Sequence, residues 1–325
     1  MDKKVFITRK IPGQGINLIK QNISHVDIFP HDRTITKQEL LDVIENYNGL
    51  LCLLTDPVDR DVLLKGRNLQ VVSNYAVGYN NIDIETATEQ NIMVTNTPGV
   101  LTDATADLTW ALILGTARKI IPADRFTRQG KFMGWEPSLF LGWPVAGQTL
   151  GIIGAGRIGT GAGLRAKGFS MNVLYTSNRT NQVLENEVNA KKVNLGELLK
   201  KSDFISIHVP LTKDTKHLIG KHEFGLMKNS AVLINTSRGP VVDEKALVEA
   251  LKNSKIAGAG LDVYENEPLL GKELKNLDNT LLLPHIGSAT FTTRGKMSVM
   301  AAENLLKALN GQKPDNLVNQ QVYGK

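Results

Sequence analysis

Short apolar runs alternate with segments of helical periodicity along the first third of the chain. The runs that predict strands lie at 5–8, 25–29, 50–54, 69–75 and 92–94, and those that predict helices lie at 15–21, 37–47 and 83–90. Parallel strands need a crossover segment between them, and a helix usually supplies it. The alternation therefore predicts an α/β domain with a parallel sheet.

This pattern is interrupted at Thr97-Pro98-Gly99, which indicates a crossing point between two domains. A helix is expected next over 103–120, with Thr102 or Asp103 as its cap. Its side chains leave little polar face, so we expect it to be buried between domains or subunits. The irregular aromatic segment at 130–144 follows, either as core filler or as a lid or subunit-interface loop.

Strand and helix patterns resume after residue 149 and predict a doubly wound sheet. Strands are expected at 150–153, 171–175, 204–208, 231–235, 256–260 and 280–283, with helices at 157–168 and 243–252. The last helix, at 293–309, comes after the sheet is complete and is expected to cross back over the first domain. The predicted division is 1–99 with 288–325, and 100–287.

Three glycines with the spacing G-x-G-x-x-G follow the strand at 150–153. Gly154 permits a tight turn, Gly156 allows close approach of a pyrophosphate, and Gly159 allows the helix to pack on the strand. This is the fingerprint of a dinucleotide site, and it includes Arg157 and Ile158. Two further glycines at 161 and 163 should each cost about 1 kcal/mol relative to Ala, and the sequence offers no reason for them.

The residues after the strand at 171–175 predict the choice of cofactor. An acidic side chain that would bind the ribose of NAD is absent from this stretch of sequence, which instead has Ser177, Asn178 and Arg179. Hydroxyl, amide and guanidinium groups suit a 2′-phosphate. We therefore predict NADPH in preference to NADH; the alternative interpretation is an ordinary polar turn.

Composition narrows the class of protein. A chain of 325 residues is long for a single core, and the net charge of +6 comes from basic residues scattered among acids. This scatter favours anionic small molecules over nucleic acid as partners. Neither a leader-like apolar core nor a run long enough to span a membrane is found. The single Cys52 lies in an apolar run, which predicts a buried thiol and a cytoplasmic protein.

Three charged or titratable residues follow predicted strands in the second half of the chain. Arg238 lies in Asn-Thr-Ser-Arg-Gly-Pro, Glu267 in Glu-Asn-Glu-Pro, and His285 in Leu-Pro-His-Ile-Gly. Ligands of doubly wound sheets bind at the carboxyl ends of the strands, so these residues predict one site. Each alone would more often be a surface or helix-cap group.

The remaining histidines have no such context and are expected to be solvated: His25, His31, His217 and His222. No metal site is predicted, because the last two are five residues apart and do not share a helix face. The sequence also has neither a G-x-S-x-G nucleophile motif nor a phosphate-binding loop that ends in Gly-Lys-Ser/Thr.

Together these motifs resemble the D-2-hydroxyacid dehydrogenase family. The segments 74–83 and 100–108 add to the resemblance, and 51–56 and 135–137 make the glyoxylate/hydroxypyruvate reductase branch the most similar. The resemblance implies a Rossmann domain inserted into a smaller, flavodoxin-like α/β substrate domain. It also implies reduction of a 2-oxo acid by hydride transfer from the nicotinamide.

Roles for the three strand-end residues follow from this resemblance. His285 resembles the general acid that protonates the carbonyl oxygen, and Glu267 resembles the carboxylate that favours its charged form. Arg238 resembles the clamp that binds the substrate carboxylate and polarises the carbonyl group.

Further roles are implied by the same resemblance. Substrate contacts are expected from Leu53, the backbone amides of Val77 and Gly78, Ser288, and Trp135 reaching a neighbouring subunit. Cofactor contacts are expected from His208, Val209, Pro210, Thr236, Asp262 and His285. We also expect a homodimer, formed by the helix at 103–120 and the aromatic segment.

Two alternatives stay open. Reductases of 2-ketogluconate or another 2-oxo acid share every one of these catalytic residues. A dinucleotide-sensing binding protein with a dehydrogenase fold would share the cofactor site but not the turnover.

Overall fold

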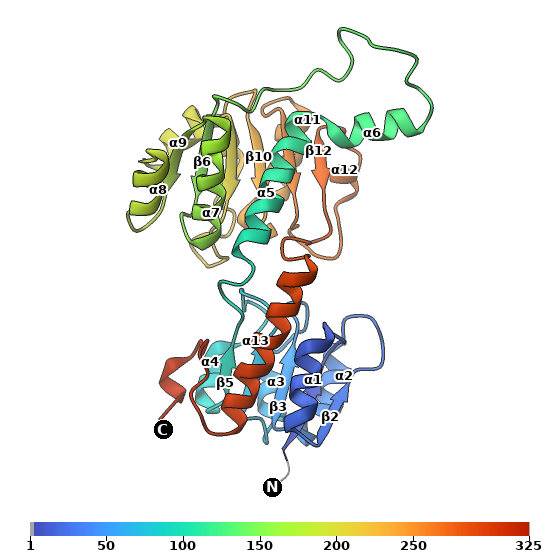
Figure 1. Cartoon of the computed structure of the whole chain (residues 1–325), viewed down its shortest axis with the longest axis vertical. Helices are drawn as coiled ribbons and strands as arrows, with labels where there is room; N and C mark the ends of the chain where they lie inside the picture. Colours follow the sequence, from blue (N-terminus) through green and yellow to red (C-terminus); the bar gives the residue numbers. More distant parts are fainter. Residues whose placement is uncertain (1–2, 325) are drawn as a thin grey trace. The chain divides into compact units, whose positions relative to one another are not determined.

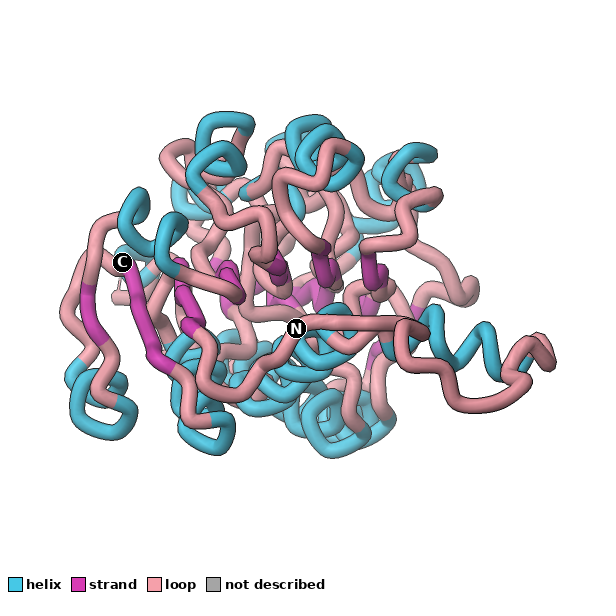
Figure 2. The backbone as a smooth tube through the Cα atoms, turned by 90° about the horizontal axis from the view of Figure 1, so that it is seen from above, coloured by secondary structure: helices cyan, strands magenta, loops and turns pink. Residues whose placement is uncertain are grey.

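The computed structural model describes residues 3–324, which form two compact units. The first unit contains residues up to Leu101 together with those from Ala289 onward, and the second runs from Thr102 to Ser288. The sequence placed these boundaries at 99/100 and 287/288. Each unit has its own parallel sheet, and helices lie on both sides of the strands (Figure 2).

A five-stranded parallel sheet forms the first unit, with the order β2-β1-β3-β4-β5. This is the flavodoxin-like order. Its strands are β1 Lys4–Ile7, β2 His25–Ile28, β3 Gly49–Cys52, β4 Val71–Asn74 and β5 Met93–Thr95. Its helices are α1 Gly13–Asn22, α2 Lys37–Val43, α3 Arg60–Lys65, α4 Ile84–Glu89 and α13 Phe291–Leu309.

The last helix, α13, covers the first unit's sheet, as predicted. It packs on α1 and on β3, β4 and β5 (Figure 1). The approach to α1 is close, because a Cβ atom at Gly15 would lie 2.1 Å from the carbonyl oxygen of Ser298. The buried thiol of Cys52 lies in the core of this unit, also as predicted, and burial raises its pKa well above the usual range.

The second unit is a seven-stranded parallel sheet with the order β12-β11-β10-β9-β6-β7-β8. The chain starts at β6, builds outward through β7 and β8, and then crosses to β9, which is the doubly wound topology. Its strands are β6 Thr149–Ile153, β7 Asn172–Thr176, β8 Lys191–Lys192, β9 Phe204–Ile207, β10 Val232–Asn235, β11 Gly258–Leu261 and β12 Thr280–Leu282. Its helices are α5 Thr102–Ala117, α6 Ile120–Arg128, α7 Arg157–Arg165, α8 Gln182–Val188, α9 Leu195–Lys201, α10 Lys221–Leu226, α11 Glu244–Lys252 and α12 Lys272–Lys275.

The close packing of α7 on α5, β6 and α8 explains the two glycines that the sequence left unexplained. A Cβ at Gly161 would lie 3.3 Å from that of Ala106 on α5, and one at Gly163 would lie 2.7 Å from Ile152. The indole nitrogen of Trp110 also donates to the carbonyl oxygen of Ala162 at 2.8 Å. Helix α7 therefore gives up helix propensity for close packing against its neighbours.

For residues 103–144, the expected end of the helix was wrong, and one of the two alternatives for the aromatic segment is excluded. Helix α5 ends at Ala117, not at 120, because Lys119 adopts a left-handed conformation (φ 52°) and α6 begins directly after it. The aromatic segment is not core filler, since Phe132 is 56% exposed and Trp135 is 84% exposed. Figure 1 shows α6 and the loop that follows it extending away from the second unit's sheet.

Candidate active site

The glycine-rich turn lies at the switch point of the second unit's sheet. Strands β6 and β9 are neighbours there, and the chain leaves them in opposite directions along the sheet. Gly154 follows β6 with a φ of 97°, and a Cβ on it would lie 2.8 Å from the amide nitrogen of Val209, just after β9. A side chain at this residue would therefore be both strained and obstructed.

The other two glycines of the motif keep the start of α7 open. Gly156 precedes the first helical residue, Arg157, and a Cβ on Gly156 would meet no atom within 4 Å. At Gly159 a Cβ would lie 2.2 Å from the carbonyl oxygen of Gly154, so the helix can follow the turn this closely only without one. Amide groups at the first turn of such a helix favour an anion. The cradle fits a dinucleotide pyrophosphate.

The loop that begins with Ser177 lies beside this cradle. Asn181 anchors it, because its side-chain amide donates to the carbonyl oxygen of Ala155 at 2.9 Å and to the hydroxyl of Thr160 at 2.7 Å. The backbone amide of Asn181 donates to the Tyr175 hydroxyl. These contacts fix both ends of the loop next to the glycine turn.

The exposed side of the same loop is polar and basic. Asn178 and Arg179 are exposed and Ser177 is partly exposed. Lys192 on β8 extends to the carbonyl oxygen of Asn178, with its Nζ at 3.5 Å, which brings a second cation to the loop. Arg179 in the loop and Lys192 beside it are thus two cationic residues close to one another in this part of the fold.

His208, at the end of β9, is neutral at physiological pH. Burial lowers its pKa to about 4, and its Nε2 lies 2.8 Å from the Ser206 hydroxyl. The segment from His208 to Pro210 thus borders the glycine turn without adding a charge to it.

The strand-end residues His285 and Glu267 are paired through their side chains. The imidazole Nδ1 lies 2.8 Å from Oε2 of Glu267, and the other carboxylate oxygen accepts from the amide of Tyr264 at 3.0 Å. Burial raises the pKa of Glu267. The hydrogen bond and charge of His285, the Tyr264 amide and the charge of Arg238 together lower this pKa by more than burial raises it. The net pKa is below the usual range, so the carboxylate is ionised.

Backbone contacts fix the ends of this pair. His285 has a left-handed conformation (φ 56°), and the residues after it are bound by Asp262, whose carboxylate accepts the amides of Ile286 and Gly287 at 2.7 Å each. The Tyr264 hydroxyl donates to the carbonyl oxygen of Leu283 at 2.7 Å. The ends of β11 and β12 are therefore joined on both sides of the histidine.

Arg238 belongs to the same site. Burial lowers its pKa and the charge of Glu267 partly offsets this, so the guanidinium stays cationic near the carboxylate. Its Nη1 donates to the carbonyl oxygen of Ser237. The next residue, Gly239, packs so tightly that a Cβ would lie 1.8 Å from the carbonyl oxygen of Tyr264. The Arg238 and Glu267 loops are thus in direct contact.

The remaining expected residues of the second unit have varied surroundings. Asp262 is buried, and burial raises its pKa despite the two amides and the charge of His285, which lower it. Both of its oxygens already bind backbone. Thr236 is buried with its hydroxyl 3.0 Å from that of Thr109. Ser288 is partly buried at the end of the unit.

In the first unit, the predicted substrate loops are joined by amide side chains. Asn74 donates to the carbonyl oxygen of Gly78 at 2.8 Å, and Asn96 donates to that of Val77 at 2.7 Å. Asn81 donates to the carbonyl oxygen of Leu53 at 3.0 Å. The turns at Leu53 and Gly78 are therefore held together at the carboxyl edge of this sheet.

One of the histidines expected to be solvated also has a side-chain partner that the sequence did not indicate. His217 is exposed, but its Nε2 lies 2.7 Å from Oε1 of Glu265, beside the catalytic loop. His25, His31 and His222 are exposed, as expected. Sequence reasoning also missed Tyr264 and Asn181, whose importance lies in contacts that no local motif reveals.

Residues 3–324 contain neither a metal-binding cluster nor a membrane-spanning helix. Within them, no group of His, Cys, Asp or Glu side chains could hold a metal ion. Over the same range, every helix is too short or too polar to cross a bilayer.

Comparisons with known proteins identify the family. Residues 110–287 match the family model of the D-isomer specific 2-hydroxyacid dehydrogenase, NAD binding domain. A glyoxylate reductase of Thermococcus litoralis is 50% identical over 99% of this chain and 98% of its own. A crystal structure of a glyoxylate reductase from Paecilomyes thermophila has a TM-score of 0.88 with 32% identity and covers 99% of this chain and 100% of its own.

An NADPH-dependent glyoxylate/hydroxypyruvate reductase from Sinorhizobium meliloti, solved with NADP and malonate, is also similar. Its TM-score is 0.85 with 28% identity, and the match covers 99% of this chain and 98% of that one.

Proposed function

Since the chain belongs to the D-isomer specific 2-hydroxyacid dehydrogenases, we propose that it reduces glyoxylate or hydroxypyruvate to glycolate or D-glycerate, with NADPH as the preferred cofactor. The observation that carries the proposal is the pair of His285 and Glu267 beside Arg238, at the carboxyl ends of neighbouring strands. The nicotinamide, when bound, supplies the hydride.

Proton transfer falls to His285. Because its Nδ1 is bound to Glu267, the ring presents Nε2 for donation to the carbonyl oxygen of the substrate. The ionised carboxylate of Glu267 binds Nδ1 and thereby fixes the plane of the ring. Negative charge that develops on the oxygen is stabilised by this donor and by the nearby cation of Arg238.

Arg238 has a second part in the proposal. A guanidinium offers parallel N–H donors that match a carboxylate, so this side chain can bind the carboxylate and the carbonyl oxygen of a 2-oxo acid together. Its burial excludes water and strengthens both interactions. The amides of Val77 and Gly78, with Leu53, remain the predicted contribution of the first unit to substrate binding.

The preference for NADPH depends on the loop after β7. Arg179 and Lys192 offer two cations for the 2′-phosphate, and Ser177 and Asn178 offer hydrogen-bonding groups. The reductase of Sinorhizobium meliloti, which is NADPH-dependent by name, supports the same choice.

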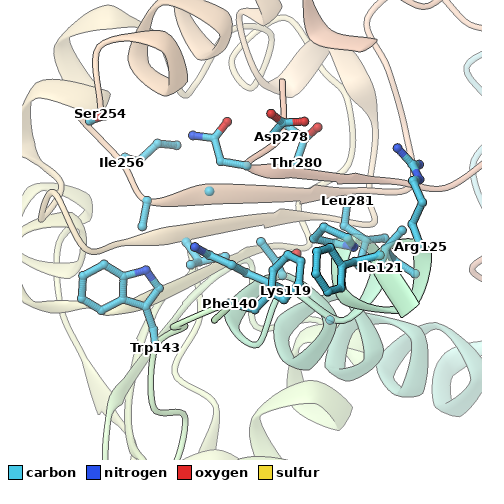
Figure 3. A pocket seen from close by; sticks show the side chains of 18 of the residues that line it. Lys119, Ile121, Arg125, Phe140, Trp143, Ser254, Ile256, Asp278, Thr280 and Leu281 are labelled. Carbon is cyan, nitrogen blue, oxygen red and sulfur yellow. The ribbon is translucent and has the colours of Figure 1, made fainter. Parts of the chain in front are cut away.

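A second copy of this chain is the proposed partner. Residues 120–143, here called the arm, contain α6, in which no residue is buried, and the exposed side chains of Met133, Trp135 and Trp143. A cavity of about 670 Å³ lies between the arm and the amino ends of β10, β11 and β12 (Figure 3). Exposed apolar area of this kind marks a protein interface. In this proposal Trp135 reaches the neighbouring subunit.

A substrate panel tests the proposed reaction. Purified protein is given glyoxylate, hydroxypyruvate, 2-ketogluconate and pyruvate, each with NADPH and with NADH, and cofactor oxidation is followed by absorbance. We expect the highest kcat/KM for glyoxylate or hydroxypyruvate with NADPH. A higher value for 2-ketogluconate would reassign the substrate within the family. Cofactor binding without turnover of any 2-oxo acid would refute the reductase and favour a dinucleotide sensor.

A further inference from the structure

We infer that Glu265 is a positioning residue for the proposed catalytic pair, acting as the joint between three loops of the second unit. The inference rests on the proposed function for its kinetic consequences only. Glu265 lies two residues before Glu267 and directly after Tyr264, whose amide binds the catalytic carboxylate. A shift of Glu265 therefore moves both partners of that hydrogen bond.

The first joint is to helix α11, which follows the Arg238 loop. Oε2 of Glu265 accepts the amide of Glu244 at 3.1 Å, and Oε2 of Glu244 accepts the amide of Glu265 at the same distance. The exchange is reciprocal, so it fixes the separation of the two backbones. A carboxylate at the first residue of a helix is also favoured by the helix dipole.

The second joint is to the segment that continues from the cofactor loop. Oε1 of Glu265 pairs with His217 at 2.7 Å, and the amide of His217 donates to the carbonyl oxygen of Pro240 at 2.8 Å. His217 has a left-handed conformation (φ 53°), which is uncommon outside glycine and needs such contacts to persist. Glu265 is thus bonded at both oxygens, with its side chain only 23% exposed.

These joints account for the tight geometry at the site. The contact between Gly239 and Tyr264 leaves no room for a Cβ, so the Arg238 and Glu267 loops must keep a fixed separation. The charged or titratable groups near the carboxylate of Glu267 are His285, Arg238 and Asp262. Their effect on it depends on that separation. Glu265 acts on the same carboxylate through the amide of Tyr264.

Glu265→Gln is the test, because it keeps the size of the side chain but weakens the pair with His217. The control is Glu249→Gln. Glu249 is an exposed residue of α11, and the hydrogen bond described for it uses its carbonyl oxygen, not its side chain. We expect kcat for the best 2-oxo acid to fall about tenfold, in line with a small misplacement of catalytic groups. The KM should change less than about twofold. The acidic limb of the pH profile should move to higher pH, because the Tyr264 amide helps to lower the pKa of Glu267 and is displaced in the variant.

A second measurement does not depend on activity. Hydrogen exchange of residues 262–268 in the protein without cofactor should be faster in Glu265→Gln than in Glu249→Gln, because the loop loses its joints. His217→Gln removes the same pair from the exposed side without touching α11, and it should give the same changes at smaller size, about threefold in kcat.

The outcomes separate the two proposals. If the unaltered protein reduces no 2-oxo acid, the proposed function fails, and the exchange measurement still decides the positioning role. If Glu265→Gln and His217→Gln match Glu249→Gln in kcat, pH profile and exchange, the positioning role is overturned even where the melting temperature falls. Loss of folding in Glu265→Gln leaves His217→Gln to decide in the same way.

Discussion

The two edges of the second unit's sheet differ in how their side chains are satisfied. At the carboxyl edge, charged groups such as Glu267 and Asp262 have hydrogen-bond partners at 2.7–3.0 Å. At the amino edge, the arm carries large apolar side chains in water, among them Trp135. Charges fixed in place indicate chemistry on a small ligand, whereas unburied apolar area indicates a protein partner. The proposed reaction and the proposed dimer interface therefore lie at opposite edges of the same sheet.

The largest expected effect follows removal of the proposed proton donor at the carboxyl edge. His285→Ala deletes the proposed proton donor, and general acids contribute factors of about 10² to 10⁴. We expect kcat/KM for the best 2-oxo acid to fall about a thousandfold, with binding of NADPH changed less than about threefold by fluorescence titration. Turnover within tenfold of the unaltered protein would remove His285 from the mechanism.

A charged substitution in the arm tests the proposed dimer interface at the amino edge. Trp143→Glu places a carboxylate in the cavity of Figure 3, and aromatic anchors at interfaces contribute about 2 kcal/mol or more. We expect the dimer to dissociate at about a hundredfold higher concentration in sedimentation velocity. Val183→Glu, an exposed apolar residue on α8, serves as the control. A monomeric unaltered protein at micromolar concentration would contradict the proposed partner.

Acid should destabilise the second unit through His208. Its pKa of about 4 in the folded protein lies below the ordinary value of 6.5, so the unfolded chain takes up a proton first as the pH falls. Stability is complete above pH 6.5 and is lost as the pH falls towards 4, by about 2 kcal/mol at pH 5. Denaturant titrations at pH 8 and pH 5 should show this loss, and His208→Asn should reduce it.

The smallest expected effect concerns the choice of cofactor. Arg179→Gln removes one of two cations near the predicted 2′-phosphate, and a charge-assisted hydrogen bond of about 1.5 kcal/mol corresponds to about tenfold. We expect kcat/KM for NADPH to fall about tenfold while that for NADH stays within about twofold. Lys191→Gln on β8 is the control. An equal loss of kcat/KM with both cofactors would show that Arg179 does not bind the 2′-phosphate.

Features that a local motif encodes could be predicted from the sequence. The turn at Gly154 needs a positive φ and an open backbone, and only glycine meets both demands, so its spacing is informative by itself. The strand-end positions of Arg238 and Glu267 were predictable for a related reason, because parallel strands deliver their carboxyl ends to one edge.

Features that depend on contacts between distant loops could not be predicted. The pair of His217 and Glu265 joins residues 48 positions apart, and nothing around either residue indicates the other. Helix α6 was missed because its side chains do not pack on the chain's own core, and α8, α9, α10 and α12 were missed because they are short. The two glycines of α7 needed the structure of its neighbours, since their reason is the space that a methyl group would occupy.

The backbone of His285 has a consequence for how this protein can be improved. A left-handed residue with a side chain is less favourable than glycine at the same place. The proposed proton donor therefore occupies a backbone conformation that favours glycine. Thermal stability and the proposed catalytic activity therefore make opposite demands on His285. A screen for heat-resistant variants that did not measure turnover would select substitutions at this residue.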